Sequence, residues 1–291
     1  MSFKGAMGNP NFEATASPSA TYSPEALRRI GYVQSKPVFG AVEENCARVE
    51  ELIGGEKADL WVLPELFSTG YQFQTRTEAV ELAEPVPGGR TARFLLRLAQ
   101  ERGCHIVAGL AEQGRDGKIY NSAVLVGPGG ITAVYRKVHL FYKERLWFSP
   151  GEEPFPVVDI GWTKVGLMIC FDHLFPEAAR TLSLAGAEVI AHPANLVLPE
   201  YGQLTMRVRA LENGVFTVTA NRIGTEDRAG EPLRFTGESQ IVSPKGEVLV
   251  RGSSDREEVR TVEVDPREAR DKSINRYNDR FRDRRPELYR I

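Results

Sequence analysis

Short apolar runs and amphipathic segments alternate along this chain from about residue 30 to residue 264. Apolar runs bounded by turn residues predict strands, and apolar positions repeated at helical spacing predict helices that pack on a sheet. The predicted strands are 30–34, 59–63, 105–111, 121–126, 131–137, 164–170, 188–192, 215–220, 239–242, 247–250 and 260–264. The predicted helices are 42–53, 91–102, 177–185 and 204–212.

The order of these elements predicts a layered α/β protein in which helices cover a mixed sheet. Residues 127–130, Gly-Pro-Gly-Gly, predict a hairpin turn, because no helix follows them as it would follow a dinucleotide-binding loop. Residues 1–22 have no periodicity, so we assign residues 1–25 to a flexible N-terminal extension, native or a non-native remnant. No long linker interrupts the rest, which favours one domain over residues 26–291.

Composition narrows the class of protein. The chain has 291 residues, 42% of them hydrophobic and 26% charged, with a net charge of −2, which is typical of a globular enzyme and gives no support for a nucleic-acid or membrane surface. Three widely separated cysteines argue against a disulfide framework and favour a cytoplasmic location. We also see no signal peptide and no apolar run of 18 residues.

Three of the predicted strands end in three different reactive side chains. Glu65 follows the strand at 59–63, Lys137 ends the strand at 131–137, and Cys170 ends the strand at 164–170. The carboxyl ends of strands line the ligand crevice in open α/β sheets, so an acid, an amine and a thiol are expected to meet there. Taken singly, each has a plain structural interpretation: a buried packing thiol, a loop carboxylate or an exposed strand-end cation.

The segments around these residues resemble the nitrilase, or carbon–nitrogen hydrolase, superfamily. The matching segments are LPELFSTGY at 63–71, YRKVHLF at 135–141 and GLMICFDHLFPEAAR at 166–180. The similarity continues through HPANLVLP at 192–199, RALENGVF at 209–216, ANRIG at 220–224 and DRRPELY at 283–289. The resemblance implies a four-layer αββα sandwich and a catalytic set of Glu65, Lys137 and Cys170.

The chemistry of C–N hydrolysis explains why these three residue types belong together. A thiol with an ordinary pKa near 8.5 is mostly protonated at neutral pH, so it needs a base, here Glu65. Glu65 can then pass the proton to departing ammonia and activate water against the thioester. Lys137 can neutralise the developing oxyanion, with the backbone N–H of Phe171 as a second donor.

The resemblance also points to further site residues. Relatives carry a second glutamate at the position of Glu144 that helps to orient substrate and lysine. His173, Tyr71, Asn195 and Arg222 are candidates for the substrate pocket, although each has a structural alternative as a surface, loop-packing or interface residue.

Two other polar residues near the motifs are expected to be structural. Glu177 is interpreted as a helix N-terminal carboxylate that favours the helix dipole or pairs with Arg180. His139 is interpreted as a hydrogen-bonded core histidine. The four histidines form no metal-ligand pair, so no metal and no cofactor are expected.

The leading functional prediction is a cofactor-independent thiol hydrolase that cleaves a small aliphatic carboxamide to acid and ammonia. A nitrilase acting through a thioimidate and an N-carbamoyl amidohydrolase use the same catalytic set and stay open. The CFDH sequence at 170–173 favours the amidase, because many nitrile-specific relatives place Trp-Glu after the cysteine. Some relatives with LPELFSTGY and CFD are nevertheless described as nitrilases of small aliphatic substrates.

Partners other than a small amide or nitrile are expected to be copies of the same chain. Family members usually form dimers through helices near the nucleophile and through the C-terminal tail, here residues 266–291. The aromatic residues Phe281 and Tyr289 among arginines suit such an interface. A binding or scaffold protein that has lost catalysis is the non-enzyme alternative, but none of the three catalytic residue types is missing.

Overall fold

A computed structural model describes residues 27–228 and 230–289, and the predicted extension at residues 1–25 lies outside this range. Two six-stranded sheets and one hairpin make up the strands of the described residues. The first sheet has the order β14 (Glu258–Val264), β1 (Arg28–Gln34), β2 (Leu60–Val62), β3 (His105–Gln113), β4 (Ile119–Gly127) and β5 (Gly130–Arg136). The second has the order β13 (Val248–Arg251), β12 (Gln240–Val242), β9 (Phe216–Ala220), β8 (Val189–Pro193), β7 (Lys164–Leu167) and β6 (Val157–Asp159). The hairpin pairs β10 (Ile223–Glu226) with β11 (Leu233–Thr236).

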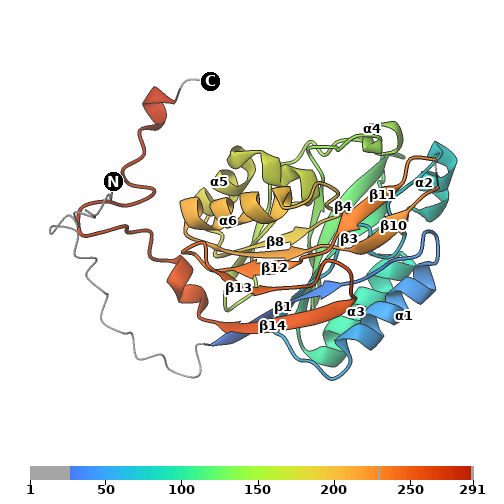
Figure 1. Ribbon diagram of the computed structural model, residues 1–291, viewed down its shortest axis with the longest axis horizontal. Helices are drawn as coiled ribbons and strands as arrows, with labels where there is room; N and C mark the ends of the chain where they lie inside the picture. The colour runs from blue at the N-terminus through green and yellow to red at the C-terminus, as the bar shows by residue number, and fades with distance from the viewer. Residues whose placement is uncertain (1–26, 229, 290–291) are drawn as a thin grey trace, which may run out of the picture.

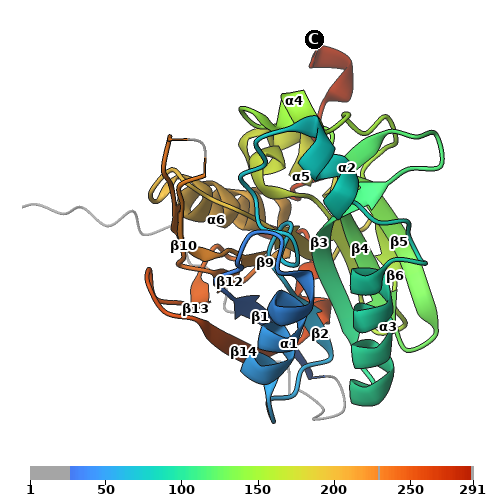
Figure 2. The same ribbon diagram turned by 90° about the vertical axis from the view of Figure 1, so that its right-hand side faces the viewer.

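Helices cover the outer face of each sheet, which gives the αββα sandwich (Figures 1 and 2). One face carries α1 (Val42–Ile53) and α3 (Arg90–Arg102), and the opposite face carries α5 (Pro176–Leu184) and α6 (Tyr201–Asn213). The short helices α2 (Arg76–Leu82) and α4 (Glu144–Trp147) lie beyond one end of the sheets, and 3-10 helices span Cys170–Leu174, Pro266–Ala269 and Pro286–Leu288. None of the helices in the described residues is long and apolar enough to cross a membrane.

The alternation of side chains along each strand builds the layers. In β2, Leu60 and Val62 point into the core between the sheets, whereas Trp61 packs beneath α1 and α3. In β8, Val189 joins the core between the sheets and Ile190 packs beneath α5 and α6. Because both faces of these strands are buried, they are continuous apolar runs in the sequence.

The strands that precede Glu65, Cys170 and Asn195 belong to parallel trios, whereas Lys137 follows the antiparallel edge strand β5. In the first sheet β2 pairs in parallel with β1 and β3, and in the second β8 pairs in parallel with β7 and β9. Antiparallel strands flank both trios. The loops that follow β2, β7 and β8 therefore leave the sheets at carboxyl ends, where α/β proteins place their ligand sites.

Most predicted elements agree with the structure to within about three residues, and the helix at 42–53 agrees at both ends. The hairpin turn at 127–130 is also confirmed, since β4 ends at Gly127 and β5 begins at Gly130. One boundary was wrong in an informative way: the strand predicted at 164–170 ends at Leu167, and Cys170 opens a 3-10 helix. The thiol thus stands in a turn after the strand instead of at its last position.

Candidate active site

Glu65 is held in a turn that packs tightly on β3. The N–H of Gly109 donates to the carbonyl of Pro64, and the N–H of Phe67 donates to the carbonyl of Gly109, at 3.2 Å in both cases. A Cβ on Gly109 would lie 2.5 Å from the Cα of Glu65, so only glycine permits this approach. The Glu65 side chain is fully buried as a result.

Lys137 reaches this carboxylate from the end of β5. Its Nζ lies 2.6 Å from Oε1 of Glu65 and 2.8 Å from Oε1 of Glu144, and its side chain has no exposed surface. A buried ammonium is stable only when paired, and here two carboxylates pair with it. Burial lowers the pKa of Lys137, but the charges of Glu144 and Glu65 outweigh this effect and raise that pKa overall, so the amine stays protonated.

Glu144 opens α4 and is the third member of a buried charged group formed by Glu65, Lys137 and Glu144. Its Oε1 accepts from the hydroxyl of Tyr71 at 2.7 Å as well as from Lys137, and its Oε2 accepts from the N–H of Phe141 at 3.0 Å. Burial and the neighbouring charge of Glu65 raise the pKa of Glu144, while Lys137 opposes the rise. The two carboxylates therefore share a single cation in a dry environment.

Cys170 presents its thiol from a backbone conformation that is unusual for a residue other than glycine. Its φ is +41°, in the left-handed region, where strain of this kind is often associated with functional sites. The fully buried His192 holds the turn, because its Nε2 lies 2.9 Å from the carbonyl oxygen of Cys170. Nδ1 of His192 lies 3.1 Å from the hydroxyl of Thr219 on β9.

The thiol of Cys170 is close enough to Glu65, Lys137 and Glu144 for their charges to shift its pKa. Burial raises the pKa of Cys170 well above its ordinary value, and the charge of Glu65 raises it further. The ammonium of Lys137 and the backbone N–H of Asn195 act in the opposite direction. A neutral thiol beside a carboxylate is the resting state expected when the base takes the proton during attack.

Asp172 connects the turn at Cys170 with the strand that delivers Lys137. Its buried carboxylate accepts from the N–H of Ile169 at 2.8 Å and from the hydroxyl of Tyr135 at 2.8 Å, and it lies 2.7 Å from Nδ1 of His139. Tyr135 and His139 stand on either side of Lys137 in the sequence. One carboxylate therefore fixes the nucleophile turn relative to the amine.

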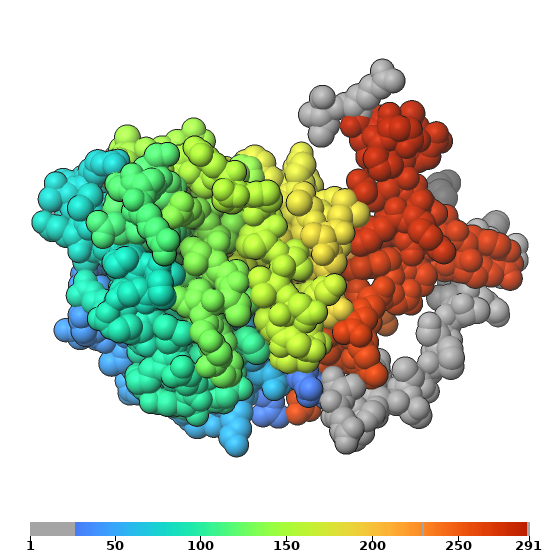
Figure 3. All heavy atoms as spheres, turned by 180° about the vertical axis from the view of Figure 1, so that it is seen from behind, coloured from blue at the N-terminus to red at the C-terminus, as the bar shows by residue number. Residues whose placement is uncertain are grey.

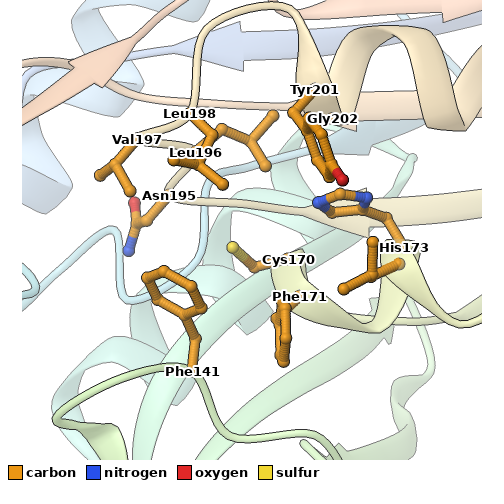
Figure 4. Close-up of a pocket in the computed structure, with 11 residues that line it drawn as sticks. Phe141, Cys170, Phe171, His173, Asn195, Leu196, Val197, Leu198, Tyr201 and Gly202 are labelled. Atoms are coloured by element: carbon orange, nitrogen blue, oxygen red, sulfur yellow. The ribbon is translucent and has the colours of Figure 1, made fainter.

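A cavity of about 190 Å³ opens at Cys170 (Figure 4). Its lining is mainly apolar and contains no acidic or basic side chain apart from His173, whose pKa burial and Arg209 lower to about 4. The sulfur of Cys170 points toward the side of the cavity where Asn195 lies. The lining residues are Phe141, Cys170, Phe171, His173, Leu174, Asn195, Leu196, Val197, Leu198, Tyr201 and Gly202.

Three of the five predicted pocket residues line this cavity: Phe171, His173 and Asn195. The N–H of Phe171 donates no hydrogen bond within the described residues, so it is available to an oxyanion. His173 lies 2.7 Å from the hydroxyl of Thr205 through Nδ1. Asn195 donates from Nδ2 to the backbone carbonyl of Glu65 at 3.0 Å.

The other two, Tyr71 and Arg222, lie outside the cavity lining. Tyr71 is turned toward Glu144, as described above. Arg222 is fully buried beside Glu226 and stacks over the ring of Phe235, 4.0 Å from its centroid. Glu226 in turn accepts from the backbone N–H groups of Tyr71 and Gln72, so this pair supports the loop behind Glu144.

His139 and Glu177, the two polar residues expected to be structural, both lie near the site. His139 is hydrogen-bonded as expected, but it is only partly buried and stacks on Phe175 with ring centroids 3.7 Å apart. Glu177 lies in the first turn of α5, as expected. Its proposed pairing with Arg180 was wrong, because that guanidinium reaches across to the carbonyl of Glu212 at 3.0 Å.

The sequence reasoning missed three polar residues that organise the site: Asn121, Asp172 and His192. Asn121 on β4 donates from Nδ2 to Oε1 of Glu65 at 2.7 Å. A usable signal was present for Asn121 and His192, since each interrupts an otherwise apolar strand and buried polar groups need partners. For Asp172, the sequence offered only its closeness to Cys170.

Comparison with known proteins identifies relatives over most of the chain. Residues 29–272 match the family model described as carbon–nitrogen hydrolase. A protein of Pyrococcus abyssi named nitrilase is 51% identical over 264 residues, which cover 90% of this chain and 98% of that protein.

Solved structures of a carbon–nitrogen hydrolase and of an amidase are also similar to this chain over most of its length. A carbon–nitrogen hydrolase from Helicobacter pylori G27 is 28% identical, with a TM-score of 0.81 and coverage of 91% of this chain and 97% of that one. An amidase variant from Nesterenkonia sp. AN1, 27% identical, has a TM-score of 0.75 and covers 90% of this chain and 98% of its own. In that amidase, acrylamide has added to the active-site cysteine.

Proposed function

The chain belongs to the carbon–nitrogen hydrolase family, and we propose that it hydrolyses small aliphatic carboxamides to the carboxylic acid and ammonia through a thioester on Cys170. The observation that carries this proposal is the convergence of three groups. Oε1 of Glu65 lies 2.6 Å from Nζ of Lys137, and both charges act on the thiol at the cavity wall.

The first half-reaction releases ammonia. Glu65 takes the proton from Sγ of Cys170 as the sulfur attacks the carbonyl carbon of the amide, and the carbonyl π-electrons move onto oxygen. Lys137 and the N–H of Phe171 stabilise this oxyanion, and a donor of this kind contributes about 3 kcal/mol. Glu65 then gives its proton to the substrate nitrogen, the C–N bond breaks, and a thioester remains.

The second half-reaction regenerates the thiol. Glu65 takes a proton from water as the water oxygen attacks the thioester carbon, and Lys137 again stabilises the oxyanion. Collapse of this intermediate breaks the C–S bond and releases the carboxylic acid. The proton on Glu65 returns to the sulfur, so every atom of the enzyme is restored and no cofactor enters the cycle.

The cavity supports an aliphatic acyl group of modest size. Its volume of about 190 Å³ and its lining of Phe, Leu, Val and Tyr side chains fit a short hydrocarbon chain. A charged group at the far end of the acyl chain would lose water without gaining a counter-charge from this lining, which is unfavourable. The proposal therefore names neutral, apolar amides.

Nitrile hydrolysis is the second candidate, because the Pyrococcus abyssi relative that is 51% identical is named a nitrilase. Both reactions use the same three groups, so substrate comparison must separate them. Ammonia release is measured with the amide, the nitrile and the N-carbamoyl amine of one carbon skeleton. We expect the amide to give the highest kcat/KM, and a higher value for the nitrile would favour the second candidate.

Replacement of Cys170 tests the mechanism itself. Cys170→Ala should fold and should release no ammonia from any substrate of the panel. Electrospray mass spectrometry of the wild type, quenched during turnover, should show an acyl adduct on Cys170. Substantial turnover by the folded variant would overturn the thioester route.

We further propose that the enzyme is a homodimer or a larger assembly of identical chains. On α6 the side chains of Tyr201, Leu204, Val208 and Leu211 are between 41% and 60% exposed and form one apolar stripe. The C-terminal tail leaves the molecule beside this helix and projects outward (Figure 3), with Tyr289 exposed. Apolar surface of this kind on adjacent elements is typical of an interface.

A further inference from the structure

Asn121 links the carboxylate of Glu65 with Lys137, although it is not one of the residues that line the cavity. It lies on β4 with its side chain fully buried. Nδ2 donates to Oε1 of Glu65 at 2.7 Å, and the backbone carbonyl of the same residue accepts from the N–H of Lys137 at 2.8 Å. One residue therefore sets the positions of two catalytic groups relative to each other.

The orientation of this carboxamide is fixed by its neighbour. The oxygen of Asn121 placed against Oε1 of Glu65 would bring two acceptors together, so the amide nitrogen must face the carboxylate. Oδ1 of Asn121 then has no hydrogen-bond partner within the described residues. An unpaired buried acceptor is destabilising, so the hydrogen bond from Nδ2 is the contact through which this side chain can favour the arrangement of the site.

The two oxygens of Glu65 are consequently not equivalent. Oε1 accepts from both Asn121 and Lys137, whereas Oε2 is buried and has no partner within the described residues. An oxygen that already accepts two short hydrogen bonds has little electron density left for a third proton. The free oxygen is the one that can receive it.

We infer that Asn121 is a positioning residue. Together with Lys137 it occupies Oε1 of Glu65 with hydrogen bonds, so that proton transfer takes place at Oε2. This inference rests on the proposed function, in which Glu65 is the general base. In each half-reaction the proton from sulfur or from water moves to Oε2, forming an O–H bond there. It later leaves Oε2 for the substrate nitrogen or for the sulfur.

The test compares Asn121→Ala and Asn121→Asp with the wild type on one aliphatic amide. Asp has the shape of Asn but presents an acceptor to Oε1 of Glu65, so it separates the donor from the volume of the side chain. Ser122→Ala is the matched control. Like the Asn121 variants, it removes one buried hydrogen bond to a carboxylate, here the 2.6 Å bond from the Ser122 hydroxyl to Glu112. Ser122 is the next residue of β4, and its side chain points to the opposite face of the sheet.

We expect kcat of Asn121→Ala to fall about 10- to 100-fold with KM changed less than about twofold, the loss that one hydrogen bond to a charged group represents. The acidic limb of its pH–rate profile should move to higher pH, because a donor to the ionised base is lost. Asn121→Asp should be no more active than Ala. Ser122→Ala should keep the kcat and the acidic limb of the wild type while its melting temperature falls.

Two results would overturn the inference. One is a folded Asn121→Ala with the kcat and acidic limb of the Ser122→Ala control, and the other is an Asn121→Asp variant more active than Ala. Asn121→Leu, which is close to Asn in size and has no donor, replaces either variant if it does not fold, and the same criteria apply. Failure of the proposed function is seen separately, as a wild type inactive on amides or an active Cys170→Ala variant.

Discussion

The hydroxyl of Tyr71 lies 2.7 Å from the oxygen of Glu144 that also binds Lys137. Tyr71 therefore contacts the carboxylate that also pairs with Lys137, although it does not line the cavity at Cys170. Tyr71→Phe removes this donor and keeps the ring that packs edge-on against Phe235. We expect kcat/KM to fall about 10-fold, as for one hydrogen bond to a charged group.

Steady-state kinetics on one amide would measure this loss. Tyr120→Phe is the control, because the hydroxyl of Tyr120 also donates to a carboxylate, Asp116, at 2.6 Å. Asp116 lies in the turn between β3 and β4, so this control should leave kcat/KM unchanged. Equal activity of the Tyr71→Phe variant and the wild type would show that the hydroxyl has no part in positioning Glu144.

Lys137→Met tests the charge balance of the buried group. Without the cation, Glu65 and Glu144 face each other with no counter-charge, and breaking a buried pair in this way costs about 3 to 5 kcal/mol of unfolding free energy. Burial already raises the pKa of Glu144 above its unfolded value, so the folded state favours a protonated Glu144. The stability from that protonated form is present at low pH and is lost as pH rises.

Urea unfolding of Lys137→Met at two pH values measures this effect. Relative to the wild type, the destabilisation should be smaller at pH 5 than at pH 8, and hydrolysis should be absent at both. A loss of unfolding free energy that is the same at the two pH values would contradict the assignment of the two carboxylates to one cation.

Two buried histidines predict acid sensitivity. Burial lowers the pKa of His173 to about 4 and of His192 to about 3, from an ordinary value of 6.5. The unfolded chain therefore binds more protons than the folded one between these values and 6.5. The stability that the neutral rings provide is complete above pH 6.5 and is lost as pH falls toward 4, at about 1.4 kcal/mol per pH unit for each ring.

Unfolding free energies at pH 7.0, 6.0 and 5.0 would reveal this slope. His173→Gln should remove about half of it, because only His192 then takes up a proton on unfolding. An unchanged slope in the variant would show that His173 is not neutral in the folded protein.

The apolar lining of the cavity predicts a preference for uncharged acyl groups. Butanamide and succinamate have similar lengths, but succinamate carries a carboxylate where butanamide carries a methyl group. We expect kcat/KM to be at least about 100-fold lower for succinamate, because no basic side chain lines the cavity to pair with its charge. Comparable values for the two substrates would contradict this description of the acyl pocket.

The exposed stripe on α6 predicts the oligomeric state. Leu204, 60% exposed, lies within the stripe, and Leu204→Asp should dissociate the assembly in light scattering at low micromolar concentration. Val80→Asp on α2 is the control, since Val80 is 45% exposed on a distant element and its replacement should not change the mass. A wild type that is already monomeric would contradict the proposed assembly.

The fold class could be predicted, and Glu65, Lys137 and Cys170 could be singled out as candidates, because their signals are local. Apolar runs and helical periodicity identify the strands and helices. A short sequence motif surrounds each of Glu65, Lys137 and Cys170. The turn at Cys170 was harder, because a buried strand and a buried turn are equally apolar. Met168 and Ile169 satisfy the pattern of a strand, but the strand ends at Leu167, although the N–H of Met168 still donates to the carbonyl of Ala191 at 3.2 Å.

The supporting residues could not be predicted because their roles depend on distant partners. Asn121 and Glu65 are 56 positions apart, and Arg222 meets the loop at Tyr71 through Glu226 and Phe235. The chain pattern marks such residues as polar, but the identity of the partner follows from the packing of two sheets. Arg222, a pocket candidate with a loop-packing alternative, lies outside the cavity lining and pairs with the carboxylate that holds the loop at Tyr71.

The complete burial of Lys137 between two carboxylates has a consequence for the medium in which the enzyme works. Dissolved ions shield charges that face water, and they have little effect on charges enclosed by protein. Surface pairs such as Arg97 with Glu50 weaken as the electrolyte becomes more concentrated, whereas Lys137 and Glu65 have no exposed surface, and Glu144 almost none, at which counterions can gather. The attraction between Lys137 and its two carboxylates is therefore expected to change little with salinity.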